Sequence, residues 1–188
     1  MFVSQEKLKS NLAEYILYMW HVEDLVRAYQ FDLEKIDENI ISRNTSSDVQ
    51  QIQLKNWYKG IVNEMKQAKL LQRGHLKEVE EKMVELNLLH ITLLNHIKNK
   101  EYIMLYDRAK PEIEELKKRS EISKEGSEEI KSKAVKSDIE ACFNGLYGIW
   151  MLRLQKKQIS EETSSAMNKI SNLIAYLTRS YHSTMNGI

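Results

Sequence analysis

The sequence predicts an all-α protein, an antiparallel bundle of roughly five to seven helices. The 188 residues include only six glycines and one proline, the residues that interrupt helices most strongly. Hydrophobic residues make up 42% and charged residues 29%, which is typical of a globular chain rather than a disordered one. Several stretches repeat apolar residues at steps of three and four, which places them on one face of a helix.

We expect one helical-bundle domain over residues 1–188, because this length is ordinary for a single core. Between about residues 110 and 137, charges of both signs crowd together with few apolar residues. This composition predicts a charged, mobile crossover inside the domain.

The composition of the chain also limits where the protein is expected to be located and which partners it is expected to bind. The net charge of +1 gives no global attraction to nucleic acid or to an acidic membrane. The amino-terminal residues lack a signal-peptide pattern, and no window is apolar enough to span a membrane. The single cysteine, Cys142, excludes an intrachain disulfide. We therefore predict a cytoplasmic protein without membrane contact.

The first predicted helix runs from Ser4 to Gln30 and carries an acid where an apolar residue is expected. Its stripe at helical spacing consists of Leu8, Leu12, Tyr15, Met19, Val22 and Val26. Glu23 falls at the edge of this stripe, where a carboxylate is costly unless it is paired or reaches water. Arg27, one turn later, is within reach as an i,i+4 neighbour.

The next elements follow from caps and breakers. Asp32 is placed to cap a short second helix, and the polar run 43–48 predicts a loop. Ser46 or Ser47 then caps a long amphipathic helix over residues 48–73.

Glycine and proline set the boundaries of the middle of the chain. Gly74 is predicted to end the long helix in a tight turn, followed by a helix over residues 76–98. His90 lies on the apolar face of that helix, where we expect a hydrogen-bonded core histidine. Residues 100–110 continue as helix until Pro111, which either kinks the helix or opens a new one.

The last two helices are predicted from their first turns. Ser137 and Glu140 have the capping-box spacing, which starts a helix at this point. Its apolar stripe is interrupted by Arg153. Ser160 is the predicted cap of the final helix.

Two helices thus each carry one charge on an apolar face, and the charges are opposite. We hypothesise that Glu23 and Arg153 meet across a helix interface, with Arg27 or Tyr147 completing their hydrogen bonds. Such a pair fixes helix register. The alternative is a small-molecule pocket lined by Tyr15, Glu23, Tyr147 and Arg153.

A basic row on the helix over residues 48–73 is the best case for nucleic acid. It consists of Lys55, Lys59, Lys66, Lys69 and Arg73. The neighbouring aromatics, however, fall on the core side, and the following helix carries the acidic row Glu78, Glu81 and Glu85. An ion-paired, solvated face is the preferred interpretation, and nucleic acid is not an expected partner.

Signatures of catalysis and metal binding are missing from the sequence. No glutamate is followed three places later by histidine, and no H-E-x-x-H occurs. His21 and Asp24 form the nearest approach to a chelating pair, but an exposed polar pair is the simpler interpretation. Cys142 falls in a core stripe and is interpreted as an inert apolar residue. We predict no metal and no cofactor, and we favour a protein that is not an enzyme.

Three stretches together resemble a known family: EYILYMWHVEDLVRAY (14–29), AKPEIEELKK (109–118) and LYGIWMLRLQKKQIS followed by EET (146–163). The family comprises uncharacterised all-helical domains of unknown function, about 180 residues long, from Bacteroides-type gut bacteria. The resemblance implies a single all-α domain and supplies no activity, cofactor or catalytic residue.

The leading functional hypothesis is a non-enzymatic helical module that acts through protein contacts, as a homodimer or with another protein. A patch of Leu17, Trp20 and Phe31 on the far side of the first helix is a candidate contact surface. The alternative hypothesis is a small-molecule-binding protein with its pocket near Glu23 and Arg153.

Overall fold

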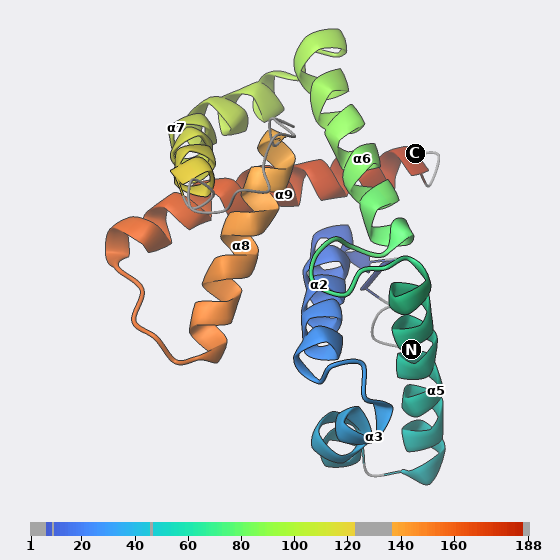
Figure 1. The fold of residues 1–188 in the computed structure, drawn as a ribbon. Coiled ribbons are helices and arrows are strands. Elements are labelled where there is room, and N and C mark those ends of the chain that lie inside the picture. The colour runs from blue at the N-terminus through green and yellow to red at the C-terminus, as the bar shows by residue number, and fades with distance from the viewer. Residues whose placement is uncertain (1–6, 9, 46, 123–136, 186–188) are drawn as a thin grey trace. The chain divides into compact units, whose positions relative to one another are not determined.

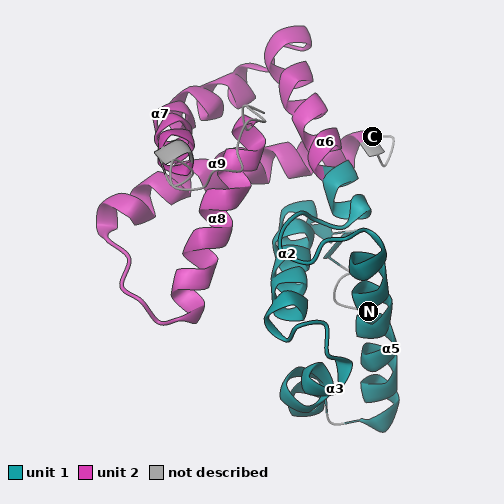
Figure 2. Ribbon diagram, in the orientation of Figure 1, with its two compact units in different colours: residues 1–82 teal, residues 83–188 magenta. Residues whose placement is uncertain are grey.

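The computed structural model describes residues 7–8, 10–45, 47–122 and 137–185 (Figure 1). These residues form helices and turns, and no strand occurs among them, so the predicted all-α class is confirmed. The chain divides into two compact units, residues 1–82 and 83–188 (Figure 2). The prediction of one domain over the whole chain stays a prediction. In the described part of the chain, no helix has both the length and the apolar character needed to cross a membrane.

The main helix of the first unit, α2 (Leu12–Ala28), begins later than predicted. Asn11 interrupts the expected helix because its side chain accepts a hydrogen bond from the Glu14 amide at 3.2 Å. An Asn in this position satisfies one of the free amides of the first turn. The helix ends at Ala28, and Gln30 and Phe31 then adopt positive φ angles of 55° and 61°.

The short second helix is confirmed together with its cap. Asp32 accepts hydrogen bonds from the amides of Glu34 and Lys35 at the start of α3 (Leu33–Ile36). A π-helical turn (Asp37–Ile41) and α4 (Ser42–Asn44) follow, so the predicted loop over residues 43–48 begins inside a helix. Ser47 occupies the N-cap position of α5, as expected.

The long helix α5 (Asp48–Gln67) ends six residues before the predicted end at residue 73. Lys69 adopts a φ of +57°, and the Leu70 amide reaches back to the Met65 carbonyl at 2.9 Å, which closes the helix. Residues 68–76 therefore form a connector between α5 and α6 rather than a tight turn at Gly74. The predicted basic row leaves the helix after Lys66.

The core of the first unit lies between α2, the short helices and α5. Its fully or nearly fully buried side chains include Leu12, Ile16, Val26, Ile36, Ile41, Tyr58 and Met65. Burial of a side chain of this size contributes about 1.5–3 kcal/mol relative to leaving it in water. The stripe predicted for the first helix is thus the face that packs.

The boundary between the units falls inside α6 (Lys77–Ile91), which a π-helical turn (Thr92–His96) extends. Lys98 has a φ of +53°, and Asn99 then caps α7 (Lys100–Ile122) by accepting from the Tyr102 amide at 2.9 Å. Pro111 lies inside α7, so residues 110–122 of the predicted crossover are helical. Residues 123–136 lie outside the described residues.

The last two helices begin where their caps predict. The Glu140 amide donates to the Ser137 hydroxyl at 3.1 Å ahead of α8 (Asp138–Leu154). The Thr163 amide donates to the Ser160 hydroxyl at 3.2 Å ahead of α9 (Glu161–Met185). α7, α8 and α9 pack on one another around Tyr102, Ile113, Phe143, Ile170, Leu173 and Leu177.

His90 is the hydrogen-bonded core histidine that the sequence predicts. Its side chain is buried, and Nδ1 lies 2.6 Å from the Tyr102 hydroxyl. Burial lowers the pKa of His90, because the imidazolium form is poorly solvated in the core.

Two glycines of the first unit are expected to respond to alanine in opposite directions. Gly60 lies inside α5 with open space around the position of an added Cβ, so Gly60→Ala should raise the free energy of unfolding by about 0.5–1 kcal/mol. Gly74 has a φ of +89°, and an added Cβ would meet Leu70 at 2.8 Å. Gly74→Ala should lower the free energy by about 1 kcal/mol or more. Urea denaturation measures the free energy of unfolding of both variants. Changes of the same sign would contradict the conformations described for Gly60 and Gly74.

Candidate functional site

Glu23 is the most unusual side chain of α2, because its carboxylate is fully buried. The Leu76 amide donates a hydrogen bond to Oε1 at 2.8 Å, and His75 Nδ1 lies 2.6 Å from Oε2. Both partners belong to the connector over residues 68–76. The buried carboxylate therefore has a partner for each oxygen, which is what makes its burial tolerable.

The His75 ring also covers Trp20. The two rings stack with their centroids 4.5 Å apart and an interplanar angle of 12°. Trp20 is 4% exposed. The prediction that Leu17, Trp20 and Phe31 form a surface patch is therefore wrong for Trp20, the largest of the three. Leu17 and Phe31 are half-buried.

Arg27 holds the connector from the neighbouring turn of α2. Its Nε donates to the Leu70 carbonyl at 3.2 Å, and a terminal nitrogen donates to the Gly74 carbonyl. The other terminal nitrogen pairs with Asp24 at 3.1 Å. Arg27 thus binds the connector and Asp24 instead of forming the expected bond to Glu23.

The remaining predicted site residues lie in different places. Tyr15 lies on α2 in the same unit as Glu23. Arg153 is exposed on α8, and Tyr147, half-buried on the same helix, lies 6.0 Å from Trp150 between ring centroids. The structure gives Glu23 partners that the sequence did not suggest, and its pairing with Arg153 in the other unit stays a prediction.

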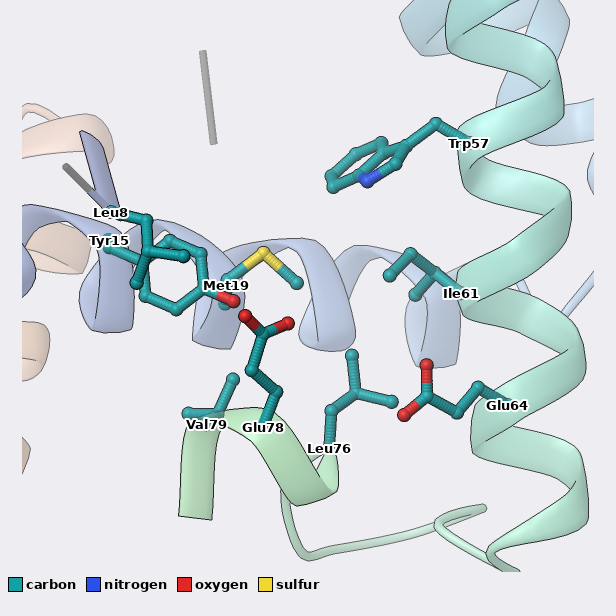
Figure 3. A pocket seen from close by; sticks show the side chains of 9 residues that line it. All are labelled: Leu8, Tyr15, Met19, Trp57, Ile61, Glu64, Leu76, Glu78 and Val79. Carbon is teal, nitrogen blue, oxygen red and sulfur yellow. The ribbon is translucent and has the colours of Figure 1, made fainter. Parts of the chain in front are cut away.

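A pocket of about 180 Å³ opens in the first unit between α2, α5 and the start of α6 (Figure 3). Apolar side chains, two aromatic rings and two carboxylates line it: Leu8, Tyr15, Met19, Trp57, Ile61, Glu64, Leu76, Glu78 and Val79. Leu76 links the pocket to the buried acid, since its amide binds Glu23 while its side chain forms part of the wall. The connector thereby sets the position of this wall.

The pKa of Tyr15 indicates the electrostatic character of the pocket. Burial raises the pKa of its hydroxyl, and the carboxylates of Glu78, Glu23 and Glu64 raise it further. The phenol consequently stays neutral beside these carboxylates. Three carboxylates close enough to act on one hydroxyl give this wall of the pocket a negative potential.

A second surface feature lies on α6 in residues 83–188. Val84 and Leu88 are each 59% exposed and Ile91 is 40% exposed. Their spacing of four and three residues places them in one stripe, while Leu86 and His90 on the other side of the helix are buried. We call Val84, Leu88 and Ile91 the α6 stripe. Sequence reasoning placed His90 correctly but did not single out this stripe.

Histidine, cysteine and acidic side chains among the residues that the structure describes are the candidates for a metal-binding cluster. Within the described ranges, no group of three or more His, Cys, Asp or Glu side chains is arranged to hold a metal ion. Cys142 is buried as predicted, and burial raises the pKa of its thiol. A thiol in this environment is a poor nucleophile.

Comparison with known proteins places the chain in a family. The family described as "Domain of unknown function (DUF4924)" matches residues 1–187. The chain belongs to the DUF4924 family. No curated protein and no solved structure matches it. The DUF4924 description assigns no activity, so the function of this domain is argued from its geometry.

Replacing Glu23 should destabilise the DUF4924 domain strongly. Glu23→Ala removes the acceptor of the Leu76 amide and the partner of His75, so a buried bond and a partly buried bond are lost. The expected loss is about 3 kcal/mol of unfolding free energy, measured by urea denaturation. Arg153→Ala is the control, expected to change stability by less than about 0.5 kcal/mol because the side chain is exposed. Equal losses of unfolding free energy in the two variants would instead support the ion pair between Glu23 and Arg153 that the sequence predicts.

Proposed function

We propose that this DUF4924 protein is a cytoplasmic, non-enzymatic helical module that acts through protein contacts, and that its partner is a second copy of the same chain. The observation that carries the proposal is the α6 stripe. Large apolar side chains that are roughly half exposed and aligned on one helix face are typical of a surface that another helix covers. The cytoplasmic location, and a Bacteroides-type source, rest on composition and resemblance alone.

Charge along α6 favours a second copy in the antiparallel direction. Glu80 and Glu81 lie about two turns before Leu88, and His96 and Lys98 follow it by slightly more than two turns. All four side chains are exposed. A twofold axis near Leu88 therefore brings each acidic start beside the basic end of the partner's helix.

The size of the stripe sets the expected strength of this contact. Covering an apolar side chain that is about half exposed contributes about 1 kcal/mol. A twofold contact covers three such side chains from each copy, or about 6 kcal/mol, and association costs at least about 4 kcal/mol. The dimer is therefore expected to be weak, dependent on protein concentration and sensitive to a charge placed in the stripe.

Sedimentation equilibrium tests the dimer. A net gain of about 2 kcal/mol corresponds to a dissociation constant of roughly 30 mM. The average mass of the wild-type protein is therefore expected to stay at the monomer mass near about 10 µM and to rise above it by about 5% at about 1 mM. Leu88→Glu places a charge at the centre of the stripe and should leave a monomer throughout this range.

Leu154→Glu is the matched control, because Leu154 is 52% exposed on α8 and lies outside the stripe. It should associate as the wild type does. Circular dichroism verifies that both variants fold. A wild-type protein that stays monomeric at every concentration contradicts the proposal, as does a Leu88→Glu variant that associates normally.

A further inference from the structure

The pocket of the first unit carries two carboxylates that come from different helices. Glu64 projects from α5 and Glu78 from the first turn of α6, and both line the pocket (Figure 3). Throughout the part of the chain that the structure describes, neither forms an ion pair with a Lys, Arg or His side chain. Two like charges on one pocket repel each other, and a cation between them removes this repulsion.

An aromatic wall accompanies the charges. The Trp57 indole reaches over the pocket from α5, above Met19 of α2 (Figure 3). Tyr18 stacks on Trp57 at 6.3 Å between ring centroids, and Tyr58 meets it edge-on at 5.0 Å. These neighbours fix the orientation of the indole. The face of a tryptophan attracts an organic cation within about 6 Å of the ring centroid.

Size and chemistry limit the kind of cation. The pocket volume of about 180 Å³ is below the roughly 300 Å³ of sites for drug-sized ligands, so the ligand must be small. The apolar walls of the pocket include Ile61, Leu76 and Val79, which suit methyl or methylene groups and provide no ligand atoms for a metal. The arrangement therefore matches an alkylated ammonium group better than an inorganic ion.

We propose that this pocket binds a small organic cation of the substituted or quaternary ammonium class. The positive nitrogen lies between Glu64 and Glu78, and the alkyl groups contact Trp57 and the apolar walls. This binding involves only residues of the first unit and does not depend on the proposed dimer. It resembles the aromatic recognition of ammonium compounds in general, with two carboxylates adding the charge.

A charged probe and its neutral isostere test the proposal on the full chain. Choline and 3,3-dimethyl-1-butanol share their shape and differ in the quaternary nitrogen. Isothermal titration calorimetry or NMR titration should show choline binding at least about tenfold more tightly than the alcohol. The choline affinity should fall as salt is added, because the carboxylates are partly exposed. Equal affinities, or no binding of choline, overturn the proposal.

Paired variants locate the binding. Glu64→Gln combined with Glu78→Gln should weaken choline binding by about tenfold or more. Glu38→Gln combined with Glu101→Gln removes the same charge from exposed positions outside the pocket and should leave the affinity unchanged. Trp57→Leu should weaken binding by roughly two- to fivefold.

Circular dichroism verifies that each variant folds. Glu64 and Glu78 are exposed, so their replacement is expected to leave the fold intact even if Trp57→Leu does not. Choline affinity that responds equally to the pocket variant and to its control overturns the assignment of the site.

Discussion

The first unit depends on one segment, the connector over residues 68–76, being held against α2 by two charged side chains. The Glu23 carboxylate accepts a hydrogen bond from the Leu76 amide. The Arg27 guanidinium donates hydrogen bonds to the carbonyls of Leu70 and Gly74. A connector that is not helical leaves both kinds of backbone group without intrahelical partners. Two residues one turn apart thus satisfy groups of opposite polarity, the acid binding the donor and the guanidinium binding the acceptors. This arrangement explains how a fully buried carboxylate persists in an apolar stripe.

The connector also positions the candidate site. Leu76 contributes its amide to Glu23 and its side chain to the pocket, and Glu78 and Val79 follow in the first turn of α6. The pocket wall is therefore anchored by hydrogen bonds as well as by packing, and such anchoring favours a preformed pocket. The α6 stripe, in contrast, consists of side chains without such an anchor, and its expected role is to be covered rather than to enclose a ligand.

Features determined by a few neighbouring residues were predictable from the sequence. The caps at Asp32, Ser137 and Ser160, and the core position of His90, depend on local spacing and are confirmed. Features determined by distant residues were not. The early end of α5 carries no glycine or proline signal, since Lys69 adopts the positive φ, and His75 lies 52 positions from Glu23. The sequence marks Glu23 as a misplaced charge. It suggested another charged side chain as partner because backbone amides and a connector histidine leave no periodic pattern.

Amide hydrogen exchange at Leu76 tests the role of Glu23 most directly, because this N–H donates to the buried carboxylate. In the wild-type protein the Leu76 amide should exchange slowly, although it lies outside the helices. Glu23→Leu fills the space with an apolar side chain of similar size and removes the partner of both the Leu76 amide and the His75 ring. It should accelerate exchange at Leu76 by at least about tenfold, while the Met65 amide inside α5 stays protected. A Leu76 amide that already exchanges freely in the wild type, or that is equally protected in the variant, would contradict the account.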